Sequence, residues 1–461
     1  MIQHHFFPSL LVVSSLFFSS CKTLTETRSV SETTLNTPKT WSTSTTKSAQ
    51  ISTGWIKEFR DPRMSELVNE SLKNNQNLRS LAHRLKAAKQ GTIVSNSTRL
   101  PSLNSSTSYR RSDSQNSATS ENYGISLSAG WEADLWGRLR NNTNASQADY
   151  EASEADYQGA RLSLAANAAK AWCNLVTAEQ QLALAEKTVE SYKTALPVVE
   201  RRYRANTLRA VDVQFARNNV SSAERSLRIR RLNRDNAART LELLLGRYPS
   251  ATVGSSNQLP SLSADIPAGL PSELLGRRPD LQAAAKRLYA SAQRAESARK
   301  NLLPSMRLTS GLSGGATSFS QAFDPNYLVY SVAASLSQTI YQGGALNGQA
   351  QAALERNLAE IQNYTRAALL AFREVESALA ADRSLAQQQE FLEKEVQQTQ
   401  LAEKRALNDI TLGIEGASFL EYLEAQRRSE NAGISLIRLK NDRLQNRIDL
   451  HLALGGDYET L

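Results

Sequence analysis

Two very long helix-forming stretches constrain the fold of this 461-residue chain more than any other feature. Residues 138–204 and 346–411 run for most of their length without glycine or proline, and Pro197 is the one interior proline. At 1.5 Å per residue, a helix of about 65 residues is a rod of ~100 Å, which does not fit inside a compact globule. The apolar spacing of residues 211–245 and 419–454 predicts return helices, so the sequence predicts antiparallel coiled-coil pairs.

An internal duplication organises these helices. The tripeptide Leu-Pro-Ser occurs at residues 100–102 and again at 303–305, which is 203 residues later. The stretches "LWGRL" and "QGGAL" are 207 residues apart, and "LLLGR" and "LALGG" are 209 residues apart. A near-constant offset indicates two copies of one unit. In each copy a helix ends at the Leu-Pro-Ser proline, a hairpin follows, and a long helix and a return helix complete the unit.

These signals divide the chain into segments. We expect a lipoprotein signal peptide at residues 1–21, a Ser/Thr-rich tether at 22–53, a first repeat at 54–247 with a hairpin at about 102–133, a linker at 248–278, a second repeat at 279–456 with a hairpin at about 305–341, and a C-terminal tail at 457–461.

The hairpin segments alternate between apolar and small polar residues. In residues 123–132 the odd positions are Tyr, Ile, Leu, Ala and Trp, and the even positions are mostly Gly and Ser. Such segments suit transmembrane strands with lipid on one side and water on the other, and they also fit a sheet with one wet face. Tyrosine and tryptophan residues near the strand ends are typical of membrane interfaces. Because every sheet edge in lipid must be paired, four strands require other subunits, and three chains supply twelve strands.

The N-terminus predicts export. An apolar run from Phe6 to Phe18 is followed by two serines and Cys21, as in a bacterial lipoprotein signal, although Phe18 replaces the usual leucine. We expect a covalent lipid on Cys21 and no other cofactor; a plain secretory signal cut nearby is the alternative. The other cysteine, Cys173, lies on an apparent helix and is expected to be a packed thiol.

Composition argues against two further classes of function. The net charge of +9 is concentrated in the basic run 225–239, whose leucines follow a helical spacing, so the arginines indicate a solvated helix face and not a nucleic-acid site. Only His83 and His451 lie beyond the signal peptide, and no nucleotide-binding, zinc or dithiol motif occurs. We therefore expect neither an enzyme nor a metal site.

Several motifs resemble one known family. They are "SAGWEADLWGRLR" (128–140), "LLGRRPDL" (274–281), "LSQTIYQGGALNGQ" (336–349), "AFREVESALA" (371–380) and "YLEAQRRSENA" (422–432). The chain resembles the TolC-like outer-membrane efflux proteins, in the lipoprotein branch that serves RND-type tripartite multidrug pumps. Within "GRRPD", Pro279 is expected to start a helix and Asp280 to lie in its first turn.

The resemblance implies a fold and an assembly. It implies a homotrimer in the outer membrane, with a twelve-stranded transmembrane β-barrel continued by a long α-helical tunnel in the periplasm. The implied partners are a periplasmic adaptor protein, an inner-membrane pump and outer-membrane lipid, with no nucleic acid.

The resemblance also places the periplasmic entrance and the adaptor contacts at two helix-turn-helix tips, residues 203–211 and 408–420. The candidates there are Asp409 and Glu415, then Asp212 and Glu421, together with Asn206 and Gly413. A ring of carboxylates from three chains would favour cations, and simple exposed carboxylates at a turn are the alternative.

The function expected is an outer-membrane exit duct through which drugs or other small molecules leave the periplasm passively. An exit duct for type I protein or peptide secretion and a non-porous periplasmic coiled-coil scaffold are the alternatives.

Overall fold

The structure is a computed structural model that describes residues 40–42, 54–115, 117–254, 258–262, 271–414 and 418–456. The signal peptide with Cys21, most of the tether, Glu415 and the C-terminal tail lie outside the described residues. Two compact units divide the chain, and each contains residues from both repeats. Unit 1 includes residues 87–152 and 284–365, and unit 2 includes residues 35–86, 153–283 and 366–461.

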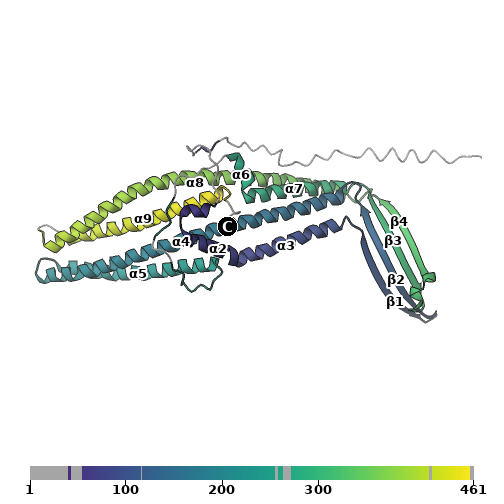
Figure 1. Cartoon of the computed structure of the whole chain (residues 1–461), viewed down its shortest axis with the longest axis horizontal. Helices are drawn as coiled ribbons and strands as arrows, with labels where there is room; N and C mark the ends of the chain where they lie inside the picture. The colour runs from purple at the N-terminus through teal and green to yellow at the C-terminus, as the bar shows by residue number, and fades with distance from the viewer. Residues whose placement is uncertain are drawn as a thin grey trace, which may run out of the picture. The chain divides into compact units, whose positions relative to one another are not determined.

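Helices dominate the chain (Figure 1). They are the 3-10 helices η3 (Trp55–Phe59), η4 (Gln321–Phe323) and η5 (Pro325–Tyr327) and the α-helices α2 (Pro62–Asn74), α3 (Gln76–Ser97), α4 (Arg138–Arg204), α5 (Ala210–Leu244), α6 (Pro271–Arg277), α7 (Pro279–Lys300), α8 (Ala345–Leu412) and α9 (Phe419–Ala453). The two rods expected from the sequence are α4, with 67 residues, and α8, with 68 residues. Pro197 lies inside α4 without ending it.

Unit 1 contains a four-stranded antiparallel sheet in the order β1-β2-β3-β4. The strands are β1 (Ser102–Ser114), β2 (Ser117–Ala133), β3 (Ser305–Ala316) and β4 (Leu328–Ser337), which lie side by side in Figure 1. The pairing of β2 with β3 joins the two repeats, because β2 ends the first hairpin and β3 begins the second. Within the described chain, β1 and β4 form the outer strands of the sheet.

Unit 2 contains the paired long helices. Salt bridges such as Arg217–Glu200 join α5 to α4. Asn441 Nδ2 donates to Asn174 Oδ1 at 2.9 Å, which joins α9 to α4. Ion pairs such as Arg447–Asp382 join α9 to α8. The four long helices therefore follow the order α5-α4-α9-α8 in this unit, with α5 and α8 on the outside of the four.

Two apolar clusters stabilise the middle of unit 2. The larger cluster packs Trp55 and Phe59 with Trp172 and with leucines of α2, α4 and α5. The second cluster lies between α7, α8 and α9 and includes Trp41 of the N-terminal segment, whose ring centroid is 6.2 Å from that of Phe372. Fully burying one large apolar side chain contributes about 1.5–3 kcal/mol. The clusters thus hold the middle parts of the long helices together.

Equivalent residues of the two repeats make equivalent contacts. In unit 2, Asn75 Nδ2 donates to the carbonyl oxygen of Leu244 at 3.1 Å. At the repeat offsets already seen in the sequence, Arg278 is the equivalent of Asn75 and Ala453 is the equivalent of Leu244. Arg278 Nη1 donates to the carbonyl oxygen of Ala453, also at 3.1 Å. Each bond satisfies a carbonyl near the end of a return helix, where no intrahelical donor remains.

The "GRRPD" motif is structural, as expected. Arg278 forms hydrogen bonds of 3.0 and 2.8 Å to the two carboxylate oxygens of Asp280 and one of 2.7 Å to Glu374. Burial acts to raise the pKa of Asp280, but the bonds and charge of Arg278 hold it below its ordinary value. The helix α7 begins at Pro279, and the motif therefore anchors α7 against α8 and α9.

In the part of the chain that the structure describes, no helix is both long and apolar enough to cross a membrane.

Candidate functional site

The sheet of unit 1 has two chemically different faces. Cross-strand pairs such as Leu127↔Leu312 and Leu312↔Tyr330 place large apolar side chains together on one face. The larger residues of this apolar face are Leu103, Thr107, Tyr109, Tyr123, Ile125, Leu127, Ala129, Trp131, Met306, Leu308, Leu312, Leu328, Tyr330, Val332, Ala334 and Leu336. Ser105, Ser310 and Gly314 lie between them, and the pair Arg111↔Glu121 follows beyond Tyr109 and Tyr123. Most of its large side chains are exposed in the single chain, so the apolar face lacks the cover that a core would give it.

The opposite face carries mainly serine and glycine. It includes Ser106 and Ser126, whose hydroxyl oxygens lie 2.8 Å apart across the β1–β2 ladder, and further pairs such as Ser128↔Gly311 and Gly311↔Ser331. Small polar side chains leave room for water beside the sheet. The sheet therefore separates an apolar surface from a hydrated one, which is the pattern of a membrane strand.

Aromatic side chains mark both ends of the apolar face. Tyr109 and Tyr123 pack against each other across β1 and β2, with tilted rings whose centroids lie 4.9 Å apart. At the other end, Trp131 Nε1 donates to the carbonyl oxygen of Arg99 at 2.8 Å. In the second repeat, Gln338 occupies the position equivalent to Trp131. Its Nε2 donates to the carbonyl oxygen of Leu302 at 3.2 Å, so an amide makes there the bond that the indole makes in the first repeat.

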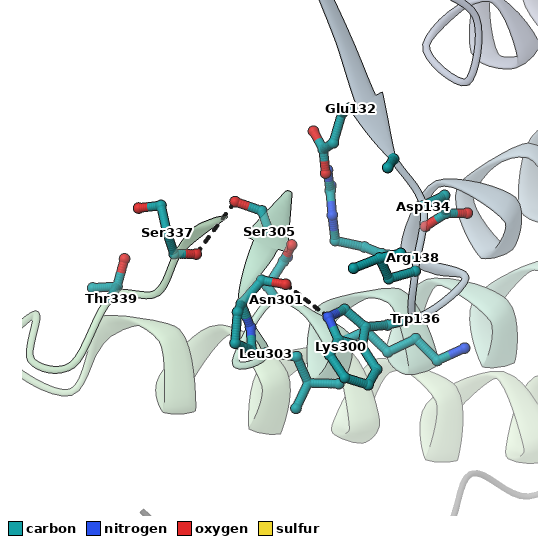
Figure 2. A pocket seen from close by; sticks show the side chains of 13 residues that line it. Glu132, Asp134, Trp136, Arg138, Lys300, Asn301, Leu303, Ser305, Ser337 and Thr339 are labelled. Carbon is teal, nitrogen blue, oxygen red and sulfur yellow. Dashed lines mark hydrogen bonds and ion pairs between the residues drawn. The ribbon is translucent and has the colours of Figure 1, made fainter. Parts of the chain in front are cut away.

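A polar pocket lies where the strands meet the helix ends of unit 1 (Figure 2). Its volume is about 280 Å³. Arg138 donates to Glu132 at 2.6 Å, and Trp136 Nε1 donates to the carbonyl oxygen of Pro304 at 2.7 Å. Asp134 accepts from the backbone N–H groups at the start of α4 and so caps that helix. The charged groups of the pocket are thus engaged in holding the hairpins on the helices.

The two helix tips in unit 2 share one turn geometry. Asn206 follows α4 with φ of 58°, and Gly413 follows α8 with φ of 71°. Thr207 N donates to the carbonyl of Arg202 at 3.0 Å, and Ile414 N donates to that of Asp409 at 3.0 Å. Both tips are Schellman turns, in which the left-handed residue allows the chain to leave the helix. Asn206 and Gly413 are 207 residues apart, as the duplication requires.

The candidate acids occupy different environments. Asp212 is buried, and its side chain accepts from the backbone N–H of Arg209 at 3.0 Å, so it caps the start of α5. Glu421 is exposed in the first turn of α9, where a negative charge is favourable. Asp409 is half-buried in the last turn of α8, where the helix dipole disfavours a carboxylate. Of the candidates in the described residues, Asp409 and Glu421 are therefore the available carboxylates.

Direct contacts connect the two tips to each other. Arg202 Nη1 donates to the carbonyl oxygen of Ile410 at 2.9 Å. An apolar cluster that includes Val199, Val213 and Phe419 packs between the same four helix ends. Arg202 does not stand out in the sequence, because a basic residue in the last turn of a helix is already explained by the helix dipole.

A group of titratable side chains lies behind the tips. Burial raises the pKa of Tyr192 to about 12, with Glu430 and Glu403 adding to the effect. The pKa of Glu430 is raised first by burial and then by the charge of Glu403, while Arg230 opposes the shift.

Burial likewise raises the pKa of Cys173 to about 12, so this thiol is packed and unreactive, as expected. Among the described residues, no group of three or more His, Cys, Asp or Glu side chains could hold a metal ion.

An open sheet with one apolar and one hydrated face, in a chain that also has long paired helices, defines a channel subunit of the outer membrane. The family model described as "Outer membrane efflux protein" matches residues 67–247 and 270–456. The chain belongs to this family, which confirms the resemblance seen in its motifs. The two matched ranges correspond closely to the two repeats.

Similar proteins agree with this assignment. The cation efflux system protein CusC of Escherichia coli O6:H1 is 30% identical over 412 residues, 88% of each chain. The pyoverdine export outer membrane protein OpmQ of Pseudomonas putida is 27% identical over 441 residues, 92% of each chain. The solved structure of the outer-membrane channel OprN superposes with a TM-score of 0.84 at 26% identity and covers 92% of this chain and 97% of that one. The predicted fold class is confirmed, and the chain is an outer-membrane efflux channel with a periplasmic extension.

Proposed function

We propose that three copies of this chain form the passive exit duct of a tripartite efflux system, coupled to a periplasmic adaptor protein and an inner-membrane pump. The observation that carries the proposal is the four-stranded sheet, whose apolar face is exposed and whose outer strands β1 and β4 each have one partner within the described chain. In lipid an unpaired strand edge costs several kcal/mol per unsatisfied group, so the edges must meet other copies.

The chemistry of the chain favours drugs or other small organic molecules as cargo. The named relatives export cations in one case and pyoverdine in another. Soft metal ions such as Cu(I) prefer thiolate, thioether and imidazole ligands. Among the described residues, however, Met64, Cys173 and His451 are buried, Met306 lies on the apolar face of the sheet, and His83 is an exposed imidazole on α3. A duct without a row of such ligands is suited to small organic molecules, which diffuse through its water-filled interior without being bound by the wall.

The helix tips are the proposed periplasmic entrance and adaptor contact. Asp409 supports this role because its carboxylate lies in the last turn of α8, where it opposes the helix dipole. A charge in that position typically costs about 0.3–1 kcal/mol, so a stabilising role does not account for it. Three copies would form a ring of carboxylates, which favours cations. Glu415, Glu421, Asn206 and Gly413 belong to the same tips, and Asp212 supports them from within α5.

Planar-bilayer recording of the purified protein tests this function. We expect stable single-channel currents with a preference for cations, and the Asp409→Asn variant should lower that preference while the protein still inserts. Glu424→Gln on the exposed face of α9 is the matched control and should leave the preference unchanged. Protein that inserts and never conducts, with or without the Asp409 change, would instead support the non-porous scaffold.

We also propose that the chain catalyses no reaction, and cells lacking the gene should become drug-sensitive without accumulating a chemically modified drug.

A further inference from the structure

The connection between β3 and β4 differs from that between β1 and β2. In the first hairpin β1 ends at Ser114 and β2 begins at Ser117, whereas in the second β3 ends at Ala316 and β4 begins at Leu328. The connecting segment of the second hairpin, residues 317–327, contains the short helices η4 and η5. Most of this segment has no counterpart in the first repeat, so the duplication does not account for it.

The connecting segment folds back over the apolar face of the sheet. A Cβ atom added at Gly314 would lie 2.6 Å from the carbonyl oxygen of Ala322 in η4. Gly314 belongs to the apolar face, because it lies between its partners Ile125 and Leu328. Gly314 and Ala316 are also the two buried residues of β3, whereas the other residues of that strand are half-buried or exposed. The segment therefore covers the apolar face near the end of β3, and a residue without a side chain makes room for it.

The segment reaches past the aromatic end of the apolar face. The pairs Tyr123↔Ala316 and Ile125↔Gly314 are successive rows of that face, and the second row lies closer to the middle of the sheet. One row corresponds to about 7 Å along a strand, or ~5 Å of depth at the tilt of membrane strands. Because Ala322 packs on Gly314, η4 lies over the apolar band and not beyond it.

Two exposed phenylalanines extend the apolar surface from this position. The ring of Phe319 lies edge-on to that of Tyr123, with centroids 6.1 Å apart, and the ring of Phe323 lies edge-on to that of Phe319 at 5.3 Å. With Tyr109, which packs on Tyr123, the four rings form a continuous row. Phe319 is 58% exposed and Phe323 is 52% exposed. Exposed apolar surface that continues a larger apolar surface marks a site of interaction.

The connecting segment is held in shape by its own hydrogen bonds. The carboxylate of Asp324 accepts from the backbone N–H and from the side-chain amide of Asn326, at 3.0 and 2.9 Å. The backbone N–H of Asp324 donates to the carbonyl oxygen of Gln321 at 3.1 Å, and that of Tyr327 donates to the carbonyl oxygen of Asp324 at 2.9 Å. Asp324 is the one charged residue in the sequence of the segment. The phenylalanines therefore project from a fixed support whose charge is already engaged.

The connecting segment lies at the outer end of the sheet. Strand β3 begins at Ser305, shortly after α7, and ends at Ala316. Figure 1 shows α7 at the first of these ends and the connection to β4 at the other. The helices belong to the periplasmic extension of the channel, so the connecting segment is on the side of the outer leaflet.

We propose that the connecting segment is a lipid-binding surface, with Phe319 and Phe323 inserted at the boundary between the headgroups and the acyl chains of the outer leaflet. Aromatic side chains are favoured at that boundary. This inference rests on the proposed function, because it takes the apolar face of the sheet to be the face that meets lipid. Three copies would carry the phenylalanines around the rim of the channel and so fix its height in the membrane.

The position of the segment favours lipid over a second copy of the chain. Helix η4 contacts β2 and β3, which are the two inner strands of the sheet, whereas other copies would meet the outer strands. The charged pair Arg111–Glu121 follows beyond Tyr109 and Tyr123 on the same face, so apolar, aromatic and charged residues succeed one another toward the outside. This succession matches the acyl chains, the interface and the headgroups of one leaflet.

Spin labels on the full chain test this position. Phe319→Cys and Phe323→Cys are labelled one at a time in a Cys21→Ser background, in which the remaining Cys173 is buried. The purified protein is reconstituted in vesicles of dilauroyl phosphatidylcholine. Electron paramagnetic resonance then measures how often each label collides with oxygen, which concentrates in lipid, and with a nickel chelate, which stays in water.

Leu127→Cys on the apolar face and Ser313→Cys on the hydrated face are the reference variants. We expect the ratio of oxygen to nickel collisions at Phe319 and Phe323 to be several-fold higher than at Ser313 and to approach that at Leu127. Labels at the two phenylalanine positions that meet nickel as often as the label at Ser313 would overturn the proposal. If the label at Leu127 is then in lipid, the proposed function stands without the lipid-binding segment; if it is in water, the proposed function fails as well.

Alanine substitutions at two neighbouring glycines test whether the segment packs on the sheet. Gly314→Ala would place a Cβ 2.6 Å from the carbonyl oxygen of Ala322, so η4 must move away and the label at Phe323 should become more mobile, with a narrower spectrum. Gly315→Ala is the matched control, because the nearest atom to its added Cβ is 3.9 Å away, on the side chain of Asn122. An unchanged spectrum in Gly314→Ala would overturn the packing on the apolar face and, with it, the lipid contact.

Discussion

Arg202 of the first tip donates its Nη1 hydrogen bond to the carbonyl oxygen of Ile410 in the second tip, at 2.9 Å. That carbonyl also accepts from the backbone N–H of Gly413, so one oxygen links the guanidinium to the turn. The two tips are therefore mechanically connected within a single chain, although about two hundred residues separate them in sequence.

Removing this bond should loosen the second tip. A hydrogen bond from a charged donor contributes about 1.5–3 kcal/mol, and partial solvent exposure of Arg202 places the effect of Arg202→Ala near 1–2 kcal/mol. We expect amide hydrogen exchange in residues 406–414 to become about 5- to 30-fold faster. Arg201→Ala, on the exposed side of the same helix turn, is the control. Equal exchange rates in the two variants would show that the bond contributes nothing to the tip.

Substitutions at the two left-handed turn residues, Gly413 and Asn206, should affect the stability of the tips in different directions. Gly413→Ala should destabilise the second tip by about 1–2 kcal/mol, because an alanine pays the steric penalty of the left-handed region. No atom lies within 4 Å of an added Cβ at Gly413, so the effect comes from the backbone alone. Asn206→Gly should be neutral or slightly stabilising for the same reason. Hydrogen exchange of both tips measures the two effects, and a destabilising Asn206→Gly would contradict the equivalence of the turns.

Glu242 predicts loss of stability in acid. Its buried carboxylate accepts from the backbone N–H groups of Ala251, Thr252 and Val253 at 2.7, 2.7 and 3.1 Å. Burial acts to raise its pKa, but these bonds hold the pKa below the ordinary glutamate value. The stabilisation is therefore present above the unfolded-state pKa of about 4.3 and disappears as the pH falls through the lower folded-state pKa.

The Glu242→Gln variant should lose about 1–3 kcal/mol at pH 7, because an amide presents one acceptor oxygen to three donors. The variant should also show less change in melting temperature between pH 5 and pH 3 than the parent chain. Thermal unfolding followed by circular dichroism measures both effects. A parallel acid response in parent and variant would rule out Glu242 as the group that titrates.

Titration of Glu430 should change the stability of the chain with pH in the direction opposite to that of Glu242. Its pKa is raised, chiefly by burial and then by Glu403, so the folded chain binds this proton more tightly than the unfolded chain. Stability should rise as the pH falls from neutral through the folded-state pKa of Glu430 toward the ordinary glutamate value. Glu430→Gln should raise the melting temperature at pH 7 and remove this part of the pH response, while Glu421→Gln on the exposed face should do neither. A lower melting temperature for Glu430→Gln would contradict the shift.

The lipid anchor stays a prediction from the N-terminal sequence. Cys21→Ser should abolish incorporation of radiolabelled palmitate, because the thiol is the attachment point for the lipid. The oligomeric state should be unchanged, since the strands and helices of the assembly lie elsewhere in the chain. Continued labelling of Cys21→Ser would show that the signal is processed differently.

Much of the fold was predictable because its signals are local. The period-2 alternation around Leu127, the Leu-Pro-Ser breakers and the scarcity of Gly and Pro between residues 138 and 204 each predict an element without reference to distant residues. The constant offsets added the duplication. These signals predicted the sheet and the rods close to their observed bounds.

The roles of single side chains at the tips were less predictable, because they depend on distant contacts. Asp212 was a candidate for the entrance, and the structure shows it capping α5 through the N–H of Arg209. Trp131 was interpreted as an interfacial aromatic, and its indole also donates to Arg99. The role of Arg202 depends on α4 and α8 ending beside each other, and no local sequence pattern shows that they do.

The spacing of the aromatic ends has a consequence for where the chain resides. Tyr123 and Trp131 are eight residues apart on β2, which is ~27 Å along the strand and, at the 35–45° tilt of membrane strands, an uncharged band of ~19–22 Å across the bilayer. This height suits a thin bilayer, whereas a thicker membrane would have to compress around the protein at a fraction of a kcal/mol for each ångström of mismatch. Summed around a closed ring, that penalty makes the thin bacterial outer membrane a better fit for the assembled protein than a thicker bilayer, so the length of the strands matches the protein to its membrane.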